Sequence, residues 1–520
     1  MKDKYEVNFQ KISIIVVYLL FSIFYVTNTN CQISNIIPSY RIPPEGTIVW
    51  ETAGCNLLLH PIEYTEFIDV TEQGVVGDGF THNYNAINQI LSNIDPNEFT
   101  IVYFPSGTYI IEQGLTLPNN TVIKGAGSDN TYLKFDLLTP DNCMYVSSNK
   151  VGIEDLYIER VDTEGDNGDN IRFSNADSCW VRGIESYYPQ RYHITIQGMS
   201  SYISITGCYF HHAQDYGGGG HGYGICIVNL ANHCLIENNI FKKLRHSIIL
   251  GQGPHRNVFG YNYSRDAYGI YMFMGIPIQI PVADICLHGD CSQGHSGHPY
   301  TGPTYNLFEG NIVEWIFVDA VWDYNGPYNT FFRNRAYHYG FKIETSHSGY
   351  PITNDDQYRQ NIVACDADPD PTTQNLINDY GFSAYWPENY LSIPDTQASY
   401  YYSAKPNFIT NWPFLANQDN PAKNRWDSGG TKTVFAGFSE YKPPTVENVR
   451  INIDTAYVYV EWDSVPGATS YKIYSSNNPY TEFELNTSGT FNGTTWQCQI
   501  NENRKFYYVN AIIDNTIIKN

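Results

Sequence analysis

Titratable side chains of three kinds recur at short intervals in the middle of the chain. They form clusters that each precede a short segment rich in β-branched and aromatic residues: His211, His212, Asp215 and His221; Arg245 and His246; Arg265 and Asp266; and His338. Imidazole, guanidinium and carboxylate groups transfer protons and stabilise anions during reactions. If the fold brings these clusters to one edge, they form a site for acid–base chemistry on a polar substrate.

A repeated pattern predicts such a fold. An apolar residue stands three places before an Asn four times, at Asn239, Asn262, Asn311 and Asn334. Weaker copies end at Leu156, Ile184 and Cys208, and the steps between successive copies are 28, 24, 31, 23, 49 and 23 residues. We interpret the step of 49 as two turns. A period in the twenties within short strands is typical of a β-solenoid, although a sandwich with evenly spaced strands is an alternative.

The repeated Asn residues suit the inward corners of a solenoid, because Asn tolerates left-handed backbone and can hydrogen bond to the Asn above and below. After each corner the sequence predicts a short strand, a turn and a second strand. The second strands begin near His193, Gly224, Ser247, Gly269 and Gly340. Coils about 4.8 Å apart would place the intervening turns along one edge. The alternative is that these turns are solvated corners with Arg–Asp pairs.

The N-terminal part of the chain carries motifs of a known family. Gly77-Asp78-Gly79 is a tight turn, residues 85–91 are amphipathic, and Phe104–Tyr109 and Lys124–Gly127 supply strands and a second glycine turn. Together these segments resemble the pectate lyase superfamily, and the resemblance covers residues 66–345. It implies an all-β right-handed parallel β-helix whose first coil is capped by the helix. It also implies a sugar groove on one sheet and its flanking loops.

For a lyase of this family, the groove must neutralise a uronate carboxylate, remove a proton and protonate the leaving oxygen. Arg, Lys, His or Tyr side chains, or a bound cation, can do this. We therefore expect catalysis by Arg245, His246, Arg265, Asp266 and Asp215. We expect substrate binding by His211, His212, His221, Tyr261, Tyr263, Tyr271, His288 and Asp290. The metal is unknown: calcium is implied by the resemblance alone, since the family's acidic calcium ligands beside an Arg or Lys base are not evident here.

Two other functions fit the same sequence. A glycoside hydrolase needs two carboxylates about 5–9 Å apart. Asp215 and Asp266 lie two coils apart, at roughly 9.6 Å, and Asp319 and Asp323 belong to a later coil. We favour a lyase because the edge has Arg and His but no adjacent acid pair. A non-catalytic polysaccharide-binding or adhesin-like protein is the third possibility, because the fold alone does not decide function.

The insertion at 273–304 is a second candidate site. It contains two Cys and three His within 13 residues, at Cys286, Cys291, His288, His295 and His298. These residue types can hold zinc. A local Cys286–Cys291 disulfide is the simpler interpretation for an exported protein. With either interpretation, His288 and Asp290 are expected to overhang the groove.

The two ends of the chain predict further segments. Three Lys before an apolar run at 12–26 are typical of a secretory signal peptide at 1–31. We expect a lead-in at 32–65 and a cap with loops at 346–442. Pro443-Pro444 then begins a segment, 443–520, whose strand Trp462 and alternating Tyr residues resemble a fibronectin type III domain.

Charge and length narrow the choice of partners. The formal net charge is −23 over 520 residues, which argues against nucleic acid because phosphate neutralisation needs an excess of Lys and Arg. The N-terminal apolar run is short for a membrane span. We therefore expect a secreted protein with a polysaccharide partner, no membrane span, and attachment to a cell surface through the C-terminal segment.

Overall fold

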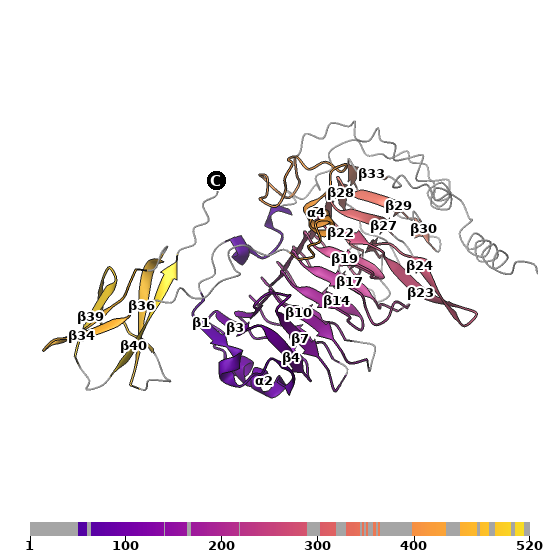
Figure 1. Ribbon diagram of the computed structural model, residues 1–520. Helices are drawn as coiled ribbons and strands as arrows, with labels where there is room; N and C mark the ends of the chain where they lie inside the picture. The colour runs from indigo at the N-terminus through magenta and orange to yellow at the C-terminus, as the bar shows by residue number, and fades with distance from the viewer. Residues whose placement is uncertain are drawn as a thin grey trace, which may run out of the picture.

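The computed structural model describes most of the chain between residues 50 and 513 (Figure 1). The predicted signal peptide and the first part of the predicted lead-in lie outside the described residues, and so do Asp290, Asp319 and Asp323. The described residues are 50–59, 64–139, 141–163, 168–217, 219–288, 302–318, 329–343, 346–347, 350–351, 357–359, 362–363, 398–432, 448–464, 468–477, 484–500 and 505–513.

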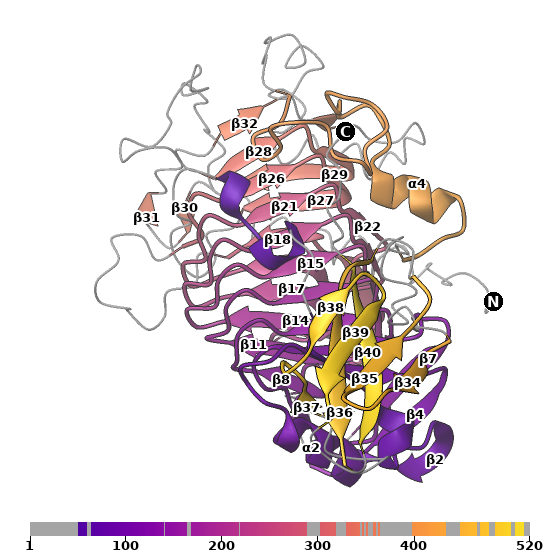
Figure 2. The same cartoon turned by 90° about the vertical axis from the view of Figure 1, so that its left-hand side faces the viewer.

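Parallel strands form three stacks along a common axis (Figures 1 and 2). Stack 1 contains β1 (Glu66–Asp69), β3 (Thr100–Phe104), β6 (Thr121–Gly125), β9 (Gly152–Glu154), β12 (Trp180–Arg182), β15 (Ser204–Thr206), β18 (Leu235–Glu237), β21 (Val258–Gly260), β26 (Leu307–Glu309), β28 (Thr330–Phe332) and β32 (Gln357–Arg359). Stack 2 contains β2 (Asp78–His82), β4 (Gly107–Ile111), β7 (Thr131–Phe135), β10 (Tyr157–Arg160), β13 (Glu185–Tyr187), β16 (Tyr209–His211), β19 (Ile240–Lys242) and β22 (Tyr263–Arg265).

Stack 3 completes the coils. It contains β5 (Leu115–Thr116), β8 (Met144–Val146), β11 (Ile171–Ser174), β14 (Tyr192–Gln197), β17 (Tyr223–Ile227), β20 (His246–Leu250) and β25 (Ile285–Leu287). In the last coils, β27 (Ile312–Val318) and β29 (Arg335–Ile343) each run through stacks 2 and 3, and β33 (Ile362–Val363) pairs with the start of β29. A short antiparallel pair, β30 (Ser346–His347) and β31 (Tyr350–Pro351), follows β29.

The chain passes from stack to stack in order, so each coil supplies strands to the same parallel sheets. This architecture is a right-handed parallel β-helix, as predicted, and its hand follows the strong preference for right-handed connections between parallel strands. Its interior is filled by apolar side chains in register. In stack 3, one such ladder is fully buried and consists of Ile171, Ile194, Ile225, Ile248 and Ile285.

The four repeated Asn side chains stand one above another at the corner between stacks 1 and 2, as predicted. Nδ2 of Asn239 donates to Oδ1 of Asn262 at 3.1 Å, and the same bond joins Asn262 to Asn311 at 3.0 Å and Asn311 to Asn334 at 2.8 Å. All four side chains are buried. A second ladder, which we did not predict, lies where stack 3 leads into stack 1 and consists of Asn257, Asn306 and Asn329.

The step of 49 residues is one coil, which corrects our interpretation of it as two turns. β21 pairs directly with β26, with Gly260 opposite Glu309. The described part of the extra chain includes an antiparallel hairpin, β23 (Tyr268–Phe273) with β24 (Ile276–Pro281), followed by β25. Gly269 therefore begins no strand of stack 3, because Ile285 takes that place opposite Ile248. The strands of the hairpin pair only with each other, so the strands before and after it keep their register with the neighbouring coils. The spacing of the Asn residues therefore could not distinguish a hairpin from an additional coil.

The N-terminal end of the β-helix is capped. η3 (Val70–Gln73) precedes α2 (Tyr84–Asn93), which buries Ile87, Ile90 and Leu91 in the main core. The carboxylate of Asp78 accepts hydrogen bonds from the backbone N–H groups of Phe80 and Thr81 at 2.8 Å, so it stabilises the turn. Two short helices, η1 (Trp50–Thr52) and η2 (Asn56–Leu59), precede β1. The cap covers a sheet edge that would otherwise invite association.

Residues 398–432 pack along the outside of the β-helix. This covering segment includes α4 (Pro421–Asp427), whose N-cap is Asn420. Oδ1 of Asn420 accepts a hydrogen bond from the N–H of Lys423 at 2.8 Å. Ala422 and Trp426 pack on the outer face of stack 2. The side chain of Asn420 also donates to the carbonyl of Asn262 at 2.8 Å, so α4 is attached to the Asn corner. The covering segment hides part of stack 2 from solvent.

Residues 448–513 contain two antiparallel sheets. One sheet has the order β34 (Arg450–Ile453), β35 (Tyr457–Glu461), β39 (Thr495–Gln499), β38 (Thr490–Asn492), and the other has the order β37 (Glu484–Leu485), β36 (Ala468–Ser476), β40 (Phe506–Ile513). Trp462 and Trp496 lie in their common apolar core. The predicted boundary at 443 falls outside the described residues. None of the helices in the described ranges is long and apolar enough to cross a membrane.

Candidate active-site edge

The edge between stacks 2 and 3 carries most of the predicted site residues. The ends of β16, β19 and β22 and the turns after them hold the clusters that contain His211, Arg245 and Arg265. Bends in β27 and β29 take the same place in the last two coils. Glu314 stands at the bend of β27, where pairing passes from β22 to β25. His338 lies in the bulge of β29 that faces it. We call this line of turns and bends the active-site edge.

The first coil of the edge joins the predicted histidines. Nδ1 of His211 lies 2.9 Å from Nδ1 of His212, and Nε2 of His211 lies 3.0 Å from the carboxylate of Glu185. Burial and the neighbouring His211 lower the pKa of His212 to about 4. In the same loop, Nδ1 of His221 lies 3.7 Å from the carboxylate of Asp215, whose side chain is 57% exposed. Asp215 is therefore accessible, whereas the histidines are mostly buried and are paired with each other or with a carboxylate.

Arg245 and His246, both predicted to be catalytic, are engaged in internal contacts. The Arg245 guanidinium donates to the carbonyl of Gly217 and, at 2.9 Å, to the hydroxyl of Tyr271. It thereby ties the loop after β16 to the β23–β24 hairpin. The ring of His246 lies on the outer face of stack 3, with Nδ1 2.6 Å from the carbonyl of Ala283. Burial lowers the pKa of His246 to about 3, so this ring stays neutral.

Tyr261 and Tyr263 are not available to a substrate, so the prediction that they bind one is wrong. Tyr261 is 1% exposed and its hydroxyl donates to the carboxylate of Glu309 beneath the covering segment. Tyr263 is 5% exposed and lies beneath α4. Their positions beside the Asn corner were predicted, but the sequence did not reveal that residues 398–432 fold back over that corner. Tyr271, in contrast, lies exposed on the hairpin.

Asp266 and Glu314 meet in the second half of the edge. The Asp266 carboxylate is one-third exposed and pairs with Arg265 at 3.1 Å. The Glu314 carboxylate accepts hydrogen bonds from the backbone N–H groups of Asp266 and, at 3.4 Å, of Ala267. Burial, together with the charge of Asp266, raises the pKa of Glu314, although these bonds and His338 oppose the shift. The Glu314 carboxyl group thus contacts the backbone of Asp266, and the two carboxyl groups lie in different environments.

A third carboxyl group supports Glu314 from behind. Oδ2 of Asp284 accepts hydrogen bonds from the backbone N–H groups of Glu314 at 2.9 Å and Trp315 at 2.8 Å, and its Oδ1 accepts one from the hydroxyl of Ser264. Burial and the charge of Glu314 raise the pKa of Asp284. Tyr337 approaches the other side of Glu314, with its hydroxyl 3.4 Å from Oε1. The acid pair is therefore held in place by buried groups.

Sequence reasoning missed both Glu314 and Asp284. Glu314 is embedded in an apolar strand, between Val313 and Trp315, and Asp284 lies in the insertion that we assigned to a loop. One signal was present in the sequence. Glu314 stands three residues after Asn311, just as Arg265, the neighbour of Asp266, stands three residues after Asn262 in the preceding coil. Aligning the coils by their Asn residues would have brought Glu314 to the edge.

A row of aromatic rings leads to the edge along the outer face of stack 2. Tyr132 and Tyr157 have ring centroids 5.3 Å apart, Tyr157 and Tyr187 are stacked at 6.4 Å, and Tyr187 lies 5.0 Å from both Tyr188 and His211. All five residues are partly exposed. Aromatic rings present large apolar faces with polar tips, which suits the faces of sugar rings. Tyrosines of this row were not among the predicted binding residues.

Residues of the insertion are only partly described. His288 follows β25 and lies beside Cys286, with Nε2 3.8 Å from Sγ, whereas Asp290, Cys291, His295 and His298 lie outside the described residues. Cys286 lies within β25, and the predicted disulfide with Cys291 falls outside the described residues. Its sulfur faces His288 on the outer face of stack 3.

Residues 67–280 match the family model described as rhamnogalacturonase A/epimerase, pectate lyase-like. The match covers less than half of the chain, and it supports a pectate lyase-like fold for the β-helix. Among curated proteins, the pre-neck appendage protein of Bacillus phage phi29 is 30% identical over 102 residues, which is 19% of this chain and 11% of that protein. The pre-neck appendage protein of Bacillus phage B103 is 31% identical over 100 residues, again 19% of this chain and 11% of the relative.

Solved structures with a related architecture include a hyperthermoactive exopolygalacturonase from Thermotoga maritima. It has a TM-score of 0.40 and 12% sequence identity, over 59% of this chain and 81% of that one. The pre-mature gene product 12 of bacteriophage phi29 has a TM-score of 0.41 and 14% identity, over 58% of this chain and 42% of that one. Because both scores lie below 0.5, we base no conclusion on them.

Proposed function

We propose that the protein is a carbohydrate-active enzyme that hydrolyses glycosidic bonds at the active-site edge, with Glu314 as general acid and Asp266 as its carboxylate partner. The observation that carries this proposal is the contact of the Glu314 carboxyl group with the backbone of Asp266, in a setting that raises the pKa of Glu314. A glycosidase needs one carboxyl group that keeps its proton and one that is ionised. We assign the proton-bearing role to Glu314 and the second role to Asp266.

The spacing of the coils places the two residues near each other. Asp266 and Glu314 belong to adjacent coils, which are about 4.8 Å apart, and the two carboxyl groups of a glycosidase are about 5–9.5 Å apart. Asp266 is one-third exposed and pairs with the Arg265 guanidinium at 3.1 Å. Glu314 is mostly buried, which favours its protonated form.

A polysaccharide that contains uronate is the substrate class we propose. Arg265 provides a partly exposed guanidinium beside the acid pair, and guanidinium is well suited to binding a carboxylate. The tyrosine row on stack 2 offers stacking faces for further sugar units. The pectate lyase-like family match of residues 67–280 supports a carbohydrate as the ligand.

The sequence alone favoured a lyase because no adjacent acid pair was evident. The position of Glu314 beside Asp266 removes that reason.

A panel of uronate-containing and neutral polysaccharides separates hydrolysis, β-elimination and binding without cleavage. We expect new reducing ends without the ultraviolet absorbance of an unsaturated product. Unsaturated ends would instead identify β-elimination. Binding without either product would identify the adhesin-like alternative.

The proposal extends to the location and the C-terminal segment. We propose that the protein is exported, as the N-terminal sequence predicts. We propose that residues 443–520 form a fibronectin type III-like module that attaches the enzyme to a surface. The two antiparallel sheets around Trp462 and Trp496 support the sandwich part of this proposal. Detection of the processed protein in the medium or at the cell surface is the corresponding test.

A further inference from the structure

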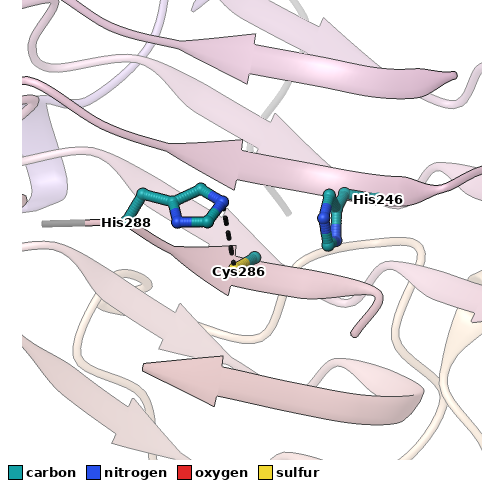
Figure 3. Close-up of side chains that lie close together, drawn as sticks. All are labelled: His246, Cys286 and His288. Atoms are coloured by element: carbon teal, nitrogen blue, oxygen red, sulfur yellow. Dashed lines mark hydrogen bonds between the residues drawn. The ribbon is translucent and has the colours of Figure 1, made fainter. Parts of the chain in front are cut away.

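Three metal-binding side chains from two adjacent strands converge on the outer face of stack 3. His246 begins β20, and Cys286 and His288 lie in and directly after β25, the next strand of the stack (Figure 3). Residues two apart on a strand point to the same face, which explains why Cys286 and His288 lie together. This cluster is separate from the acid pair of the active-site edge.

The distances within the cluster suit a shared ion. Sγ of Cys286 lies 3.8 Å from Nε2 of His288, and one ligand atom from each of the three residues lies within 4.8 Å of the others. Zinc bonds of about 2.3 Å to sulfur and about 2.0–2.1 Å to nitrogen imply a separation of about 3.6 Å between tetrahedral ligands. The sulfur and the His288 nitrogen are thus close to their bound separation. Figure 3 shows the two imidazoles on either side of the Cys286 sulfur.

The hydrogen bond of His246 prepares this ring for a metal. Nδ1 lies 2.6 Å from the carbonyl oxygen of Ala283. A carbonyl can only accept, so Nδ1 carries the proton and Nε2 keeps its lone pair. Metal-bound histidines commonly donate their second ring N–H to a backbone carbonyl in this way. The ring is therefore fixed in the tautomer that a metal requires.

We infer that His246, Cys286 and His288 form a binding site for a divalent transition-metal ion of the zinc type. A thiolate and two imidazoles are ligands that zinc prefers, whereas calcium and magnesium prefer oxygen. Three protein ligands leave one position of a tetrahedral ion for water or another small ligand. The ion would join β20 to β25, two strands that pair directly although the β23–β24 hairpin lies between them in the sequence.

Cobalt provides a direct readout of the sulfur ligand. The full-length protein is reduced, stripped of metal, freed of reductant by gel filtration without oxygen, and titrated with Co²⁺. We expect a thiolate-to-cobalt charge-transfer band that saturates at one equivalent, visible bands typical of tetrahedral cobalt, and loss of both when zinc is added. Zinc should also raise the melting temperature, since a ligand that binds only the folded state stabilises it.

Variants assign the band to the cluster. Cys286→Ala should abolish the charge-transfer band, and His288→Asn should weaken cobalt binding at least about tenfold, because even changes beyond the ligands cost about 10–100-fold. Cys226→Ala is the matched control: this buried thiol occupies the same ladder two coils earlier, with Ile249 between it and Cys286. It should leave the band unchanged.

Three results would overturn the site. They are no thiolate band in the parent protein at one equivalent, a band that survives in Cys286→Ala, or a band that Cys226→Ala removes as fully as Cys286→Ala. Circular dichroism checks that each variant is folded. If Cys286→Ala does not fold, unaltered cobalt affinity in His288→Asn contradicts the site on its own. These readouts are independent of any activity on polysaccharides.

Discussion

The backbone N–H of Glu314 donates a hydrogen bond of 2.9 Å to Oδ2 of Asp284. A fully buried carboxyl group thus fixes the bend of β27 from which Glu314 reaches the active-site edge. The same oxygen accepts the N–H of Trp315 at 2.8 Å, so the bend is held at two successive residues. The proposed acid depends on a group that no substrate touches.

Asp284→Asn tests this positioning role. Burial and the charge of Glu314 raise the pKa of Asp284, which favours its neutral form. The neutral amide of Asp284→Asn mimics that form, and its oxygen can still accept the two backbone bonds, so kcat/KM and its pH profile should stay close to those of the parent. Asp284→Ala leaves the N–H groups of Glu314 and Trp315 without this partner and should lower kcat/KM. Equal kcat/KM values for the two variants would contradict the positioning role.

Asn262→Leu tests the Asn ladder. Asn262 donates to Asn311 and to the carbonyl of Ile236, and it accepts from the side chain and N–H of Asn239. Leucine leaves these buried groups without partners, at about 1–3 kcal/mol each, so we expect a loss of at least about 3 kcal/mol in the free energy of unfolding. Chemical denaturation measures it. The exposed Asn88 provides the control Asn88→Leu, and equal midpoints for the two variants would contradict the ladder.

Glu237 should make stability depend on pH. Burial, and next the neighbouring Glu309, raise its pKa to about 8, although Tyr402 donates a hydrogen bond to it. The folded protein therefore keeps a proton that the unfolded chain releases near pH 4.5. The stabilisation is complete below about pH 4.5 and is lost as the pH rises to about 8, on the order of several kcal/mol.

Glu237→Gln isolates this contribution, because the neutral amide mimics the protonated acid at every pH. Its melting temperature should match that of the parent near pH 5 and exceed it above pH 8. The titratable groups that face Glu237 are Glu309, Tyr261, Tyr401 and Tyr402, and they are retained in the variant. A constant difference between the two proteins from pH 5 to pH 8.5 would show that Glu237 is ionised throughout.

A chain that ends at Lys442 should keep the β-helix and its activity. The main core of the β-helix and the core around Trp462 and Trp496 share no residue. Far-ultraviolet circular dichroism and the polysaccharide assay check this prediction. Collapse of the β-sheet signal in the shortened chain would place the boundary elsewhere.

The repeat made the fold predictable, because Asn at an inward corner performs the same task in every coil. The active-site edge followed from stacking the coils, and the turns after β16, β19 and β22 do lie along it. The β23–β24 hairpin was not predicted, because its hydrogen bonds are local. The position of the covering segment at 398–432 was not predicted either, because this segment lacks the repeat and buries Tyr261 and Tyr263 by long-range packing.

The acid pair shows why the site was harder to predict than the fold. Asp266 stands in a polar turn and was noticed, whereas Glu314 reaches the same edge from a continuous strand whose neighbours are apolar. Its chemistry depends on burial and on contact with Asp266, and neither property is visible until the coils are placed in register. The case of Arg245 and His246 is the opposite one. Their residue types suit catalysis, but both side chains form hydrogen bonds within the protein.

Glu314→Gln tests the central claim most directly. On a polysaccharide that the parent hydrolyses, release of reducing ends should fall about 10²–10⁴-fold, the usual contribution of a general acid. The melting temperature should stay close to that of the parent. Glu461→Gln, the same change on the separate antiparallel sheet, should keep full activity. A Glu314→Gln protein that is folded and releases reducing ends at the parental rate would contradict the assignment of the acid pair as the catalytic site.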